Sequence, residues 1–280
     1  MKKILITGKG SYIGSVLEGY LTKWEDKYSV ETLDMLDDGW KSFDFSGYDA
    51  VVHVAGIAHQ KETKENAELY YKVNRDLAIE VAKKAKECGV GQFVFLSSMS
   101  VYGMDRGVIT PETVPSPKSN YGISKLQAEA GLKELEAPSF KISVLRPPMV
   151  YGKNCRGNFQ LMLKLVKKSP VFPAVKNQRS MISVLNLSAF IRLVIDKEQG
   201  GVFFPQNREY VNTTEMAHVM AETVGKKVFF SSLAGLLIKM ASPFVSAARK
   251  AFSTLIYKDC EVFGFEYEEE SFSESVKNSI

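Results

Sequence analysis

The sequence predicts an α/β fold built on a doubly wound parallel sheet, because short apolar runs alternate with helical patterns along the chain. The apolar runs 3–6, 50–55, 92–96 and 142–146 are typical of buried strands. Between them, the segments 67–89 and 119–136 have the periodicity of helices. Ligands of such sheets bind at the carboxyl ends of the strands, so the residues that follow the apolar runs form the candidate site.

A glycine-rich loop follows the first strand and precedes a helical pattern that begins at Ser15. A strand, a glycine turn and a helix N-terminus in this order hold the pyrophosphate of a dinucleotide through backbone N–H groups. The alternative is a plain glycine loop that joins a strand to a helix. The candidate nucleotide-binding residues of the loop are Gly8, Gly10, Ser11, Tyr12, Ile13 and Gly14.

An aspartate ends the second strand roughly twenty residues beyond Gly14, where an acid binds the ribose hydroxyls of adenosine. This residue, Asp34, would repel a 2′-phosphate and therefore favours NAD. Lys9 would pair with that phosphate and therefore favours NADP. We expect NAD as the cofactor, with NADP as the alternative. An ordinary loop carboxylate and an ordinary solvated lysine are the structural alternatives for these two side chains.

Ser98, Tyr121 and Lys125 are the candidate catalytic residues. Tyr121 precedes Lys125 by four residues in a predicted helix, so both side chains lie on one face. The ammonium favours the phenolate and is expected to lower the pKa of Tyr121 from about 10 toward neutrality. Such a tyrosine takes a proton from a sugar hydroxyl or gives one to a ketone. Ser98 ends the neighbouring strand 92–96 and can hold the same oxygen.

The composition argues against several classes of function. The net charge is only +4, and no Lys/Arg block with interleaved aromatic residues marks a nucleic-acid surface. The three cysteines and three histidines do not have the spacing of metal ligands. We therefore expect no nucleic-acid partner and no metal.

The apolar run at the N-terminus stops at Thr7 and Gly8, which is too early for a signal peptide. No run has the length needed to span a bilayer. The richest apolar segment, 233–256, is interrupted by Lys239, Pro243 and two further basic residues, and predicts two amphipathic helices. We expect a cytoplasmic protein without membrane contact, with monotopic membrane binding as the less favoured alternative.

Three further segments occur in the order expected of one known family. They are His53-Val54-Ala55-Gly56, Asn74 within Lys72-Val73-Asn74, and Arg146-Pro147-Pro148-Met149-Val150-Tyr151-Gly152. With the glycine loop and the Tyr-Lys pair, they resemble the extended short-chain dehydrogenase/reductase family, in its NAD-dependent epimerase/dehydratase branch. The resemblance implies that Ala55, Gly56 and Pro147 contact the cofactor, that Asn74 lies beside its nicotinamide end, and that Lys125 binds the nicotinamide ribose.

The same resemblance implies a sugar-nucleotide site. It assigns Ser98, Met99, Asn158 and Arg179 to the substrate, with the arginine on a phosphate. A helix cap at Asn158 and an ordinary surface charge at Arg179 are the alternatives. The segment 260–265 also resembles a late turn of the family.

Two departures from the family pattern matter. Ser11 stands where the family has a glycine, and its hydroxyl is small enough to reach a phosphate. Met99 and Ser100 occupy the places where the branch's dehydratases carry Asp-Glu, so dehydration is not expected.

The resemblance implies a Rossmann nucleotide-binding domain over residues 1–155 and a smaller, interleaved substrate-binding lobe over 156–280. The segment 183–206 is expected to return to the Rossmann sheet. The function implied is reduction of a UDP-4-keto (6-deoxy) hexose at C4 in the synthesis of surface-polysaccharide precursors, and the nearest family likeness is to capsular UDP-sugar 4-ketoreductases. The alternatives are a UDP-glucose/UDP-N-acetylglucosamine 4-epimerase and, less favoured, a non-catalytic dinucleotide-sensing scaffold. A UDP-sugar is the expected partner, and a homodimer is compatible with this reading.

Overall fold

The structure is a computed structural model that describes residues 1–58, 62–63, 65–242, 244–260 and 266–280. It divides into two compact units. The first comprises Met1–Gly103, Val114–Pro147 and Leu187–Pro205, and the second comprises Met104–Thr113, Pro148–Asn186 and Gln206–Ile280. Both units are therefore assembled from separate stretches of the chain. The assignment of a nucleotide-binding and a substrate-binding region to residues 1–155 and 156–280 stays a prediction.

A six-stranded sheet forms the centre of the first unit, and all of its strand pairs are parallel. The order is β10-β6-β4-β3-β1-β2, so the direction of winding reverses between β1 and β3. The strands are β1 (Lys2–Thr7), β2 (Tyr28–Leu33), β3 (Ala50–His53), β4 (Gln92–Leu96), β6 (Lys141–Leu145) and β10 (Gly201–Phe203).

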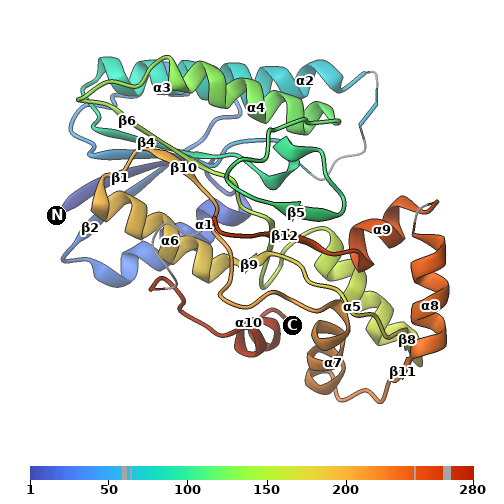
Figure 1. Cartoon of the computed structure of the whole chain (residues 1–280). Helices are drawn as coiled ribbons and strands as arrows, with labels where there is room; N and C mark the ends of the chain where they lie inside the picture. Colours follow the sequence, from blue (N-terminus) through green and yellow to red (C-terminus); the bar gives the residue numbers. More distant parts are fainter. Residues whose placement is uncertain (59–61, 64, 243, 261–265) are drawn as a thin grey trace. The chain divides into compact units, whose positions relative to one another are not determined.

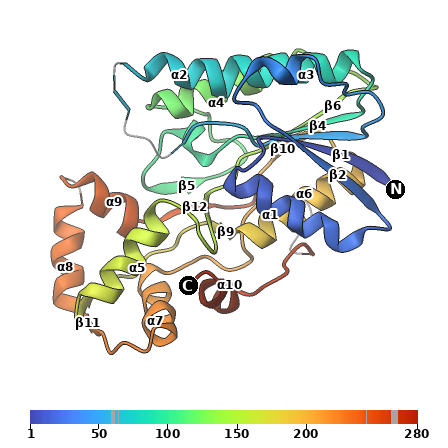
Figure 2. The same cartoon turned by 180° about the vertical axis from the view of Figure 1, so that it is seen from behind.

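Helices cover both faces of this sheet (Figures 1 and 2). One face carries α2 (Ala67–Tyr71), the π-helix η3 (Lys72–Asp76), α3 (Leu77–Glu87) and α4 (Asn120–Lys133). The other carries α1 (Tyr12–Leu21) and α6 (Val184–Lys197). Three 3₁₀ turns, η1 (Thr22–Trp24), η2 (Asp38–Lys41) and η4 (Met99–Tyr102), complete the unit. The doubly wound fold is thereby confirmed, although the expected helix 67–89 is interrupted by a π turn.

Burial on both faces explains why the strands read as continuous apolar runs. Val51, Phe93 and Phe95 of the sheet pack with Ala82 of α3 and Leu132 of α4, and all five side chains are fully buried. Branched and aromatic side chains suit such strands, whereas the small Ala82 lets α3 approach the sheet closely.

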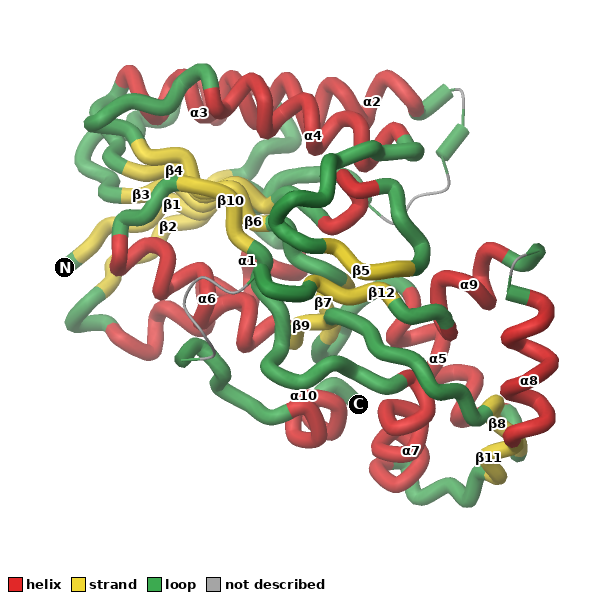
Figure 3. Tube along the Cα trace, in the orientation of Figure 1, coloured by secondary structure: helices red, strands yellow, loops and turns green. Residues whose placement is uncertain are grey.

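The second unit contains three two-stranded parallel sheets (Figure 3). They pair β5 (Gly107–Ile109) with β12 (Leu255–Tyr257), β7 (Met149–Tyr151) with β9 (Met181–Ser183), and β8 (Val171–Pro173) with β11 (Phe229–Ser231). Its helices are α5 (Asn158–Lys168), α7 (Thr213–Thr223), α8 (Ser232–Ala241), α9 (Ser246–Phe252) and α10 (Phe272–Asn278).

The apolar segment 233–256 contains the two short helices α8 and α9, as predicted, and its last two residues begin β12. Within the described residues, no helix is long and apolar enough to cross a membrane. All three cysteines are free, and the described part of the chain holds no group of three or more acidic, histidine or cysteine side chains suited to a metal. Of the family-like turn 260–265, residues 261–265 lie outside the described residues.

A fully buried histidine ends β3 in the core of the first unit. The Nδ1 atom of His53 lies 2.8 Å from the Thr7 hydroxyl, and its ring stacks on Phe93 and Phe95. Burial and, secondarily, the Lys125 charge lower the pKa of His53 to about 3. The folded protein therefore holds this imidazole neutral over most of the acid range.

Acid should destabilise the fold through His53. Between its ordinary pKa of 6.5 and its folded value of about 3, the unfolded chain binds a proton that the folded chain does not, so stability falls as pH falls. His53→Gln keeps a polar side chain but removes this titration. Urea unfolding at a series of pH values should show a shallower loss of stability in the variant across this window. Parallel losses in both proteins would contradict the assignment.

Candidate active site

The structure brings Ser98 and Tyr121 together at the carboxyl end of β4. Ser98 is the N-cap of η4, where its Oγ accepts a hydrogen bond from the Ser100 N–H at 3.1 Å. Tyr121 is the second residue of α4, and its phenol is hydrogen-bonded to the Ser98 side chain. Gly122 permits this approach, because an added Cβ would lie 2.6 Å from the Ser100 carbonyl oxygen.

Polar groups fix the start of the helix that carries Tyr121. The Ser119 Oγ caps α4 by accepting from the Gly122 N–H at 3.1 Å. The Glu62 carboxylate accepts from the N–H groups of Asn120 and Tyr121 at 3.0 and 3.1 Å. An anion here satisfies helix N–H groups and suits the positive end of the helix. The sequence carried no signal for Glu62, which lies far upstream in a loop.

Burial raises the pKa of Tyr121, the hydrogen bond with Ser98 opposes this increase, and the nearby Tyr70 adds to it. The expected lowering of this pKa toward neutrality by the lysine is therefore wrong for the protein without nucleotide. The physical reason is that removing the phenolate from water costs more than the Ser98 hydroxyl restores. Tyr121 is consequently a neutral phenol near pH 7.

Lys125 is buried, and its ammonium contacts the end of β4. Its Nζ donates to the Leu96 carbonyl oxygen at 2.7 Å and lies 4.5 Å from the centre of the Phe95 ring. Burial lowers the pKa of Lys125 to about 7, against the opposing effect of Glu129. The ammonium is thus poised to lose or gain a proton near neutrality.

Gly56 and Asn74 surround the same lysine. A Cβ added to Gly56 would lie 2.9 Å from the Asn74 Oδ1 and 3.4 Å from the Lys125 Nζ. Asn74 is fully buried in the π-helix η3, where its Oδ1 accepts from the Ile57 N–H at 2.9 Å. Its Nδ2 donates to the Ile57 carbonyl oxygen at 3.1 Å. Two predicted cofactor residues, Gly56 and Asn74, therefore lie beside the ammonium of a third, Lys125. The π turn that holds Asn74 is of a kind frequent at functional sites.

The glycine loop lies at the carboxyl end of β1 and has the geometry that close approach of a phosphate requires. Gly8 has a φ of +116°, and a Cβ there would lie 2.8 Å from the Ala55 N, so only glycine fits against β3. Gly10 has a φ of +75° and nothing within 4 Å of an added Cβ, which leaves open space beside the loop. The open backbone and the helix N-terminus fit a dinucleotide pyrophosphate.

Ser11 uses its hydroxyl within the protein. The Ser11 Oγ caps α1 by accepting from the Gly14 N–H at 3.2 Å. A Cβ on Gly14 would lie 2.6 Å from that oxygen, so the serine and the last glycine fit each other. Tyr12 and Ile13 follow as the first helical residues and are half-buried. The substitution of glycine by Ser11 therefore strengthens the cap of the helix that would face the pyrophosphate.

Asp34 and Lys9 are neighbours at the ends of β2 and β1. The backbone N–H groups of Gly8 and Lys9 both donate to the Leu33 carbonyl oxygen, at 2.9 and 3.1 Å. Asp34 directly follows Leu33, and its Oδ1 accepts from the Leu36 N–H at 2.9 Å. Both charged side chains are exposed, so each is available to a ligand at this edge of the sheet.

A buried ion pair joins α4, the helix that carries Tyr121, to the end of β6. The Arg146 guanidinium contacts Glu129 through Nη2 at 2.6 Å and through Nε at 3.1 and 3.2 Å. Its Nη1 donates to the Tyr102 hydroxyl at 2.7 Å, and the Ser97 hydroxyl donates to Glu129. Sequence reasoning missed this network, although Glu129 lies four residues after Lys125 and so on the same face of α4.

A hydrogen bond between Met99 and Pro147 links the segments that follow β4 and β6. The Met99 N–H donates to the Pro147 carbonyl oxygen at 2.9 Å, and both residues are buried. This contact fixes the residue after Ser98 against the end of β6.

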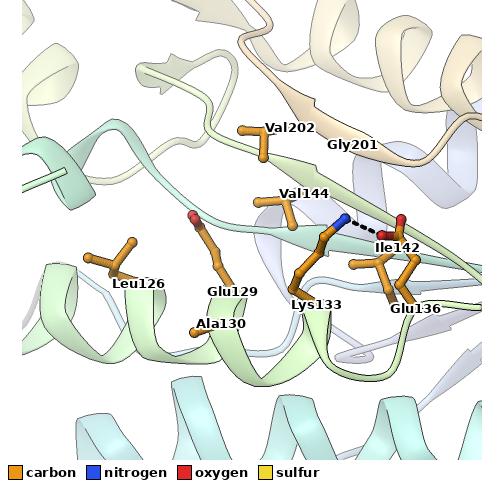
Figure 4. Close-up of a pocket in the computed structure, with 9 residues that line it drawn as sticks. All are labelled: Leu126, Glu129, Ala130, Lys133, Glu136, Ile142, Val144, Gly201 and Val202. Carbon is orange, nitrogen blue, oxygen red and sulfur yellow. Dashed lines mark hydrogen bonds and ion pairs between the residues drawn. The ribbon is translucent and has the colours of Figure 1, made fainter. Parts of the chain in front are cut away.

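A separate cavity of about 330 Å³ opens between α4 and the strands β6 and β10 (Figure 4). Glu129 and Glu136 contribute carboxylates to a wall that is otherwise mainly aliphatic. The Lys133 ammonium at its rim pairs with Glu136. The lining residues are Leu126, Glu129, Ala130, Lys133, Glu136, Ile142, Val144, Gly201 and Val202, none of which is a predicted site residue.

The remaining predicted substrate residues belong to the second unit. Asn158 is exposed and is the first residue of α5, whose N-cap is Gly157 without a side-chain cap, so the alternative of a helix cap at Asn158 is excluded. Arg179 is half-buried, its Nη1 donates to the Ser253 carbonyl oxygen at 2.8 Å, and burial lowers its pKa. Arg179 is therefore more ordered than an ordinary surface charge. The roles of both residues toward a substrate stay predictions.

Comparison with known proteins identifies the class of the chain. Residues 4–203 match the model of the NAD dependent epimerase/dehydratase family, so the chain belongs to that family. UDP-glucose 4-epimerase of Vibrio cholerae is 33% identical over 251 residues, which cover 80% of this chain and 76% of that protein. The chain is therefore an NAD(P)-dependent enzyme of this family, as the sequence predicted.

Solved structures agree with the fold. UDP-glucuronic acid 4-epimerase from Bacillus cereus, in complex with NAD, is 19% identical and has a TM-score of 0.76 over 99% of this chain and 97% of its own. dTDP-4-dehydrorhamnose reductase from Bacillus anthracis, in complex with NADP, is 22% identical and has a TM-score of 0.73 over 99% of this chain and 98% of its own. Both dinucleotides therefore occur on this fold.

Replacing Asp34 should change the preference between these cofactors. If the carboxylate binds the ribose hydroxyls, Asp34→Ala should weaken NAD by about tenfold, because hydrogen bonds to a charged group are lost. NADP should weaken less, since repulsion of its 2′-phosphate is relieved. Titration of both cofactors measures this, with Asp38→Ala as a control for loss of an exposed acid nearby. An unchanged preference ratio would transfer the discrimination to Lys9 and favour NADP.

Proposed function

We propose that this enzyme reduces the C4 ketone of a UDP-4-keto (6-deoxy) hexose in the synthesis of surface-polysaccharide precursors. The observation that carries the proposal is the environment of Tyr121, a half-buried phenol that is hydrogen-bonded to Ser98 and whose pKa is raised by desolvation. A neutral phenol is a proton donor, and reduction of a ketone needs a proton donor at the carbonyl oxygen.

Different residues of the first unit would bind the cofactor, donate the proton and stabilise the resulting phenolate. The glycine loop, Asp34 and Lys125 would hold the dinucleotide, which when bound in its reduced form supplies the hydride. Tyr121 donates its proton to the C4 oxygen as negative charge develops there. The Ser98 hydroxyl is in place to stabilise the phenolate that remains, since it already bonds the phenol. Met99 and Ser100 supply no carboxyl group after Ser98, so elimination of a hydroxyl is not part of this proposal.

The substrate class rests on the relatives and on two polar residues. UDP sugars occur in the names of the Vibrio cholerae and Bacillus cereus proteins. Arg179 and Asn158 are proposed to hold the sugar nucleotide, because a guanidinium matches a diphosphate with two parallel hydrogen bonds. A homodimer and a cytoplasmic location remain expectations from the sequence.

A 4-epimerase of UDP-glucose or UDP-N-acetylglucosamine is the second candidate. The specific observation in its favour is the 33% identity with UDP-glucose 4-epimerase of Vibrio cholerae. Epimerisation begins with removal of a proton from the C4 hydroxyl, so Tyr121 would first have to act as a base rather than as an acid. A non-catalytic dinucleotide sensor is less favoured, since it would not need Ser98, Tyr121 and Lys125 together.

Removing the Tyr121 hydroxyl should abolish most of the turnover and leave the fold intact. Tyr121→Phe should lower kcat by a factor of about 10² to 10⁴, the usual contribution of a general acid. Nucleotide affinity, measured by titration calorimetry, should remain that of the wild type. Tyr71→Phe is the matched control, because its hydroxyl contacts Asn120 at the start of the same helix. Turnover like that of the wild type in Tyr121→Phe would remove Tyr121 from the mechanism.

Stoichiometry separates the reductase from the epimerase. A reductase consumes one reduced nucleotide for each sugar, whereas an epimerase regenerates its NAD⁺ in every turnover. We expect a UDP-4-keto-6-deoxy sugar to be reduced with NADH or NADPH at matching stoichiometry. UDP-glucose and UDP-N-acetylglucosamine should remain unchanged without added cofactor. Rapid C4 inversion of either sugar by protein that copurifies with bound nucleotide would establish the epimerase instead.

A further inference from the structure

The helix α8 in the second unit directs its apolar stripe away from the protein. Leu233, Leu236, Leu237 and Met240 are spaced as i, i+3, i+4 and i+7, the pattern that normally faces a core. Here these side chains are 69, 54, 59 and 65% exposed.

The opposite side of α8 explains this orientation. Gly235 is the buried residue of the helix, and an added Cβ there would lie 1.9 Å from the Ala174 carbonyl oxygen. The helix therefore docks on its own unit through a glycine and against backbone, in the region beside β8 (Figure 1). Close contact at Gly235 turns the opposite, leucine-bearing side of α8 away from the core.

Two further exposed aromatic side chains lie close to α8 in the sequence. Phe229 at the start of β11 is 68% exposed, and Phe244 after α8 is 89% exposed. We call Phe229, Leu233, Leu236, Leu237, Met240 and Phe244 the α8 surface. Exposed apolar residues that share one face of a helix, as the four on α8 do, mark an interaction site, whereas isolated ones are ordinary.

The stretch of sequence that carries the α8 surface has charges of one sign, although Asp105, from outside this stretch, pairs with Arg249 of α9. The sequence from residue 223 to residue 258 contains no Asp or Glu, although the chain has 32 of them in total. The same stretch contains six basic residues, of which Lys227, Lys239, Lys250 and Lys258 are exposed. Lys239 lies on α8 itself, one residue before Met240, and so flanks the stripe.

We propose that the α8 surface docks on an anionic phospholipid bilayer, with α8 lying in the plane of the interface. A helix of this kind combines an exposed apolar stripe with flanking cations and needs no membrane span. A second copy of the chain fits less well, because a two-fold contact would set this basic surface against itself. The expectation of no membrane contact rested on the lack of a run long enough to span a bilayer and on four residues, Lys239 among them, that interrupt the segment 233–256. An interfacial helix needs no such run, and a lysine beside its apolar stripe suits it.

Vesicle cosedimentation of the full chain tests this proposal independently of the catalytic one. We expect binding to vesicles of phosphatidylcholine mixed with phosphatidylglycerol, much weaker binding to phosphatidylcholine alone, and weakening by salt. The double variant Leu236→Gln/Leu237→Gln should bind at least about tenfold more weakly, because two buried leucines are lost from the interface. Val114→Gln, an equally polar change at an exposed apolar residue of the first unit, should bind as the wild type does.

Folding and self-association are checked on the same samples. The variants change exposed residues, so their thermal midpoints should match the wild type; if the double variant does not fold, Lys239→Glu replaces it and should also weaken binding. Absence of binding to anionic vesicles, or equal binding of wild type and variants, would overturn the proposal. Loss of an oligomer in the variant, without any change in vesicle binding, would assign the α8 surface to a second copy of the chain.

Discussion

The buried ion pair between Glu129 and Arg146 sets the position of the helix that carries the chemistry. Tyr121, Lys125 and Glu129 follow one another at four-residue intervals along α4, so they share one face. Arg146 follows the end of β6 and holds the last of the three. The rotation of α4 that satisfies this pair also turns Tyr121 toward Ser98.

Burying the Glu129–Arg146 pair costs desolvation free energy, so the pair forms only where both partners meet. Two charges removed from water gain little net stability, but loss of one partner leaves the other unpaired and costs about 3–5 kcal/mol. Ser97 and Tyr102 satisfy further hydrogen-bonding positions of the pair and connect it to the end of β4 and to η4. The Glu129 carboxylate, together with Arg146, therefore connects three elements around Ser98. They are the end of β4, the turn η4 and the helix α4.

Burial is also the common cause of the two unusual acidities at the site. It raises the pKa of Tyr121 and lowers that of Lys125, because it disfavours the phenolate and the ammonium alike. The site is thereby kept close to neutral, and Tyr121 retains the proton that reduction of a ketone consumes. The α8 surface is a distinct property of the second unit, carried by exposed rather than buried side chains.

Much of the fold was predictable because the strands have apolar runs that only burial on both faces explains. The glycine loop and the Tyr-Lys spacing also identified residues that the fold brings to strand ends. The Glu129–Arg146 pair was missed, since no local pattern links a helix to a strand end seventeen residues later. The sequence predicted a lowered pKa for Tyr121, whereas the structure raises it. The four-residue spacing from Lys125 reveals a neighbouring charge, but it does not reveal how far the phenol is removed from water. Likewise, the apolar stripe of α8 would be expected to face the core. The sequence does not reveal that the helix packs on the protein through Gly235, on its other side.

Direct titration of Tyr121 tests the proposed proton donor most directly. Proteins labelled with ¹³C at the tyrosine ring allow the Tyr121 resonance to be assigned by comparison with Tyr121→Phe and followed with pH in the absence of nucleotide. A phenol whose pKa is raised by desolvation should remain protonated through the neutral range and ionise only above the ordinary value of about 10. Ionisation of Tyr121 near neutral pH would contradict the assignment and would favour a phenolate base, as an epimerase requires.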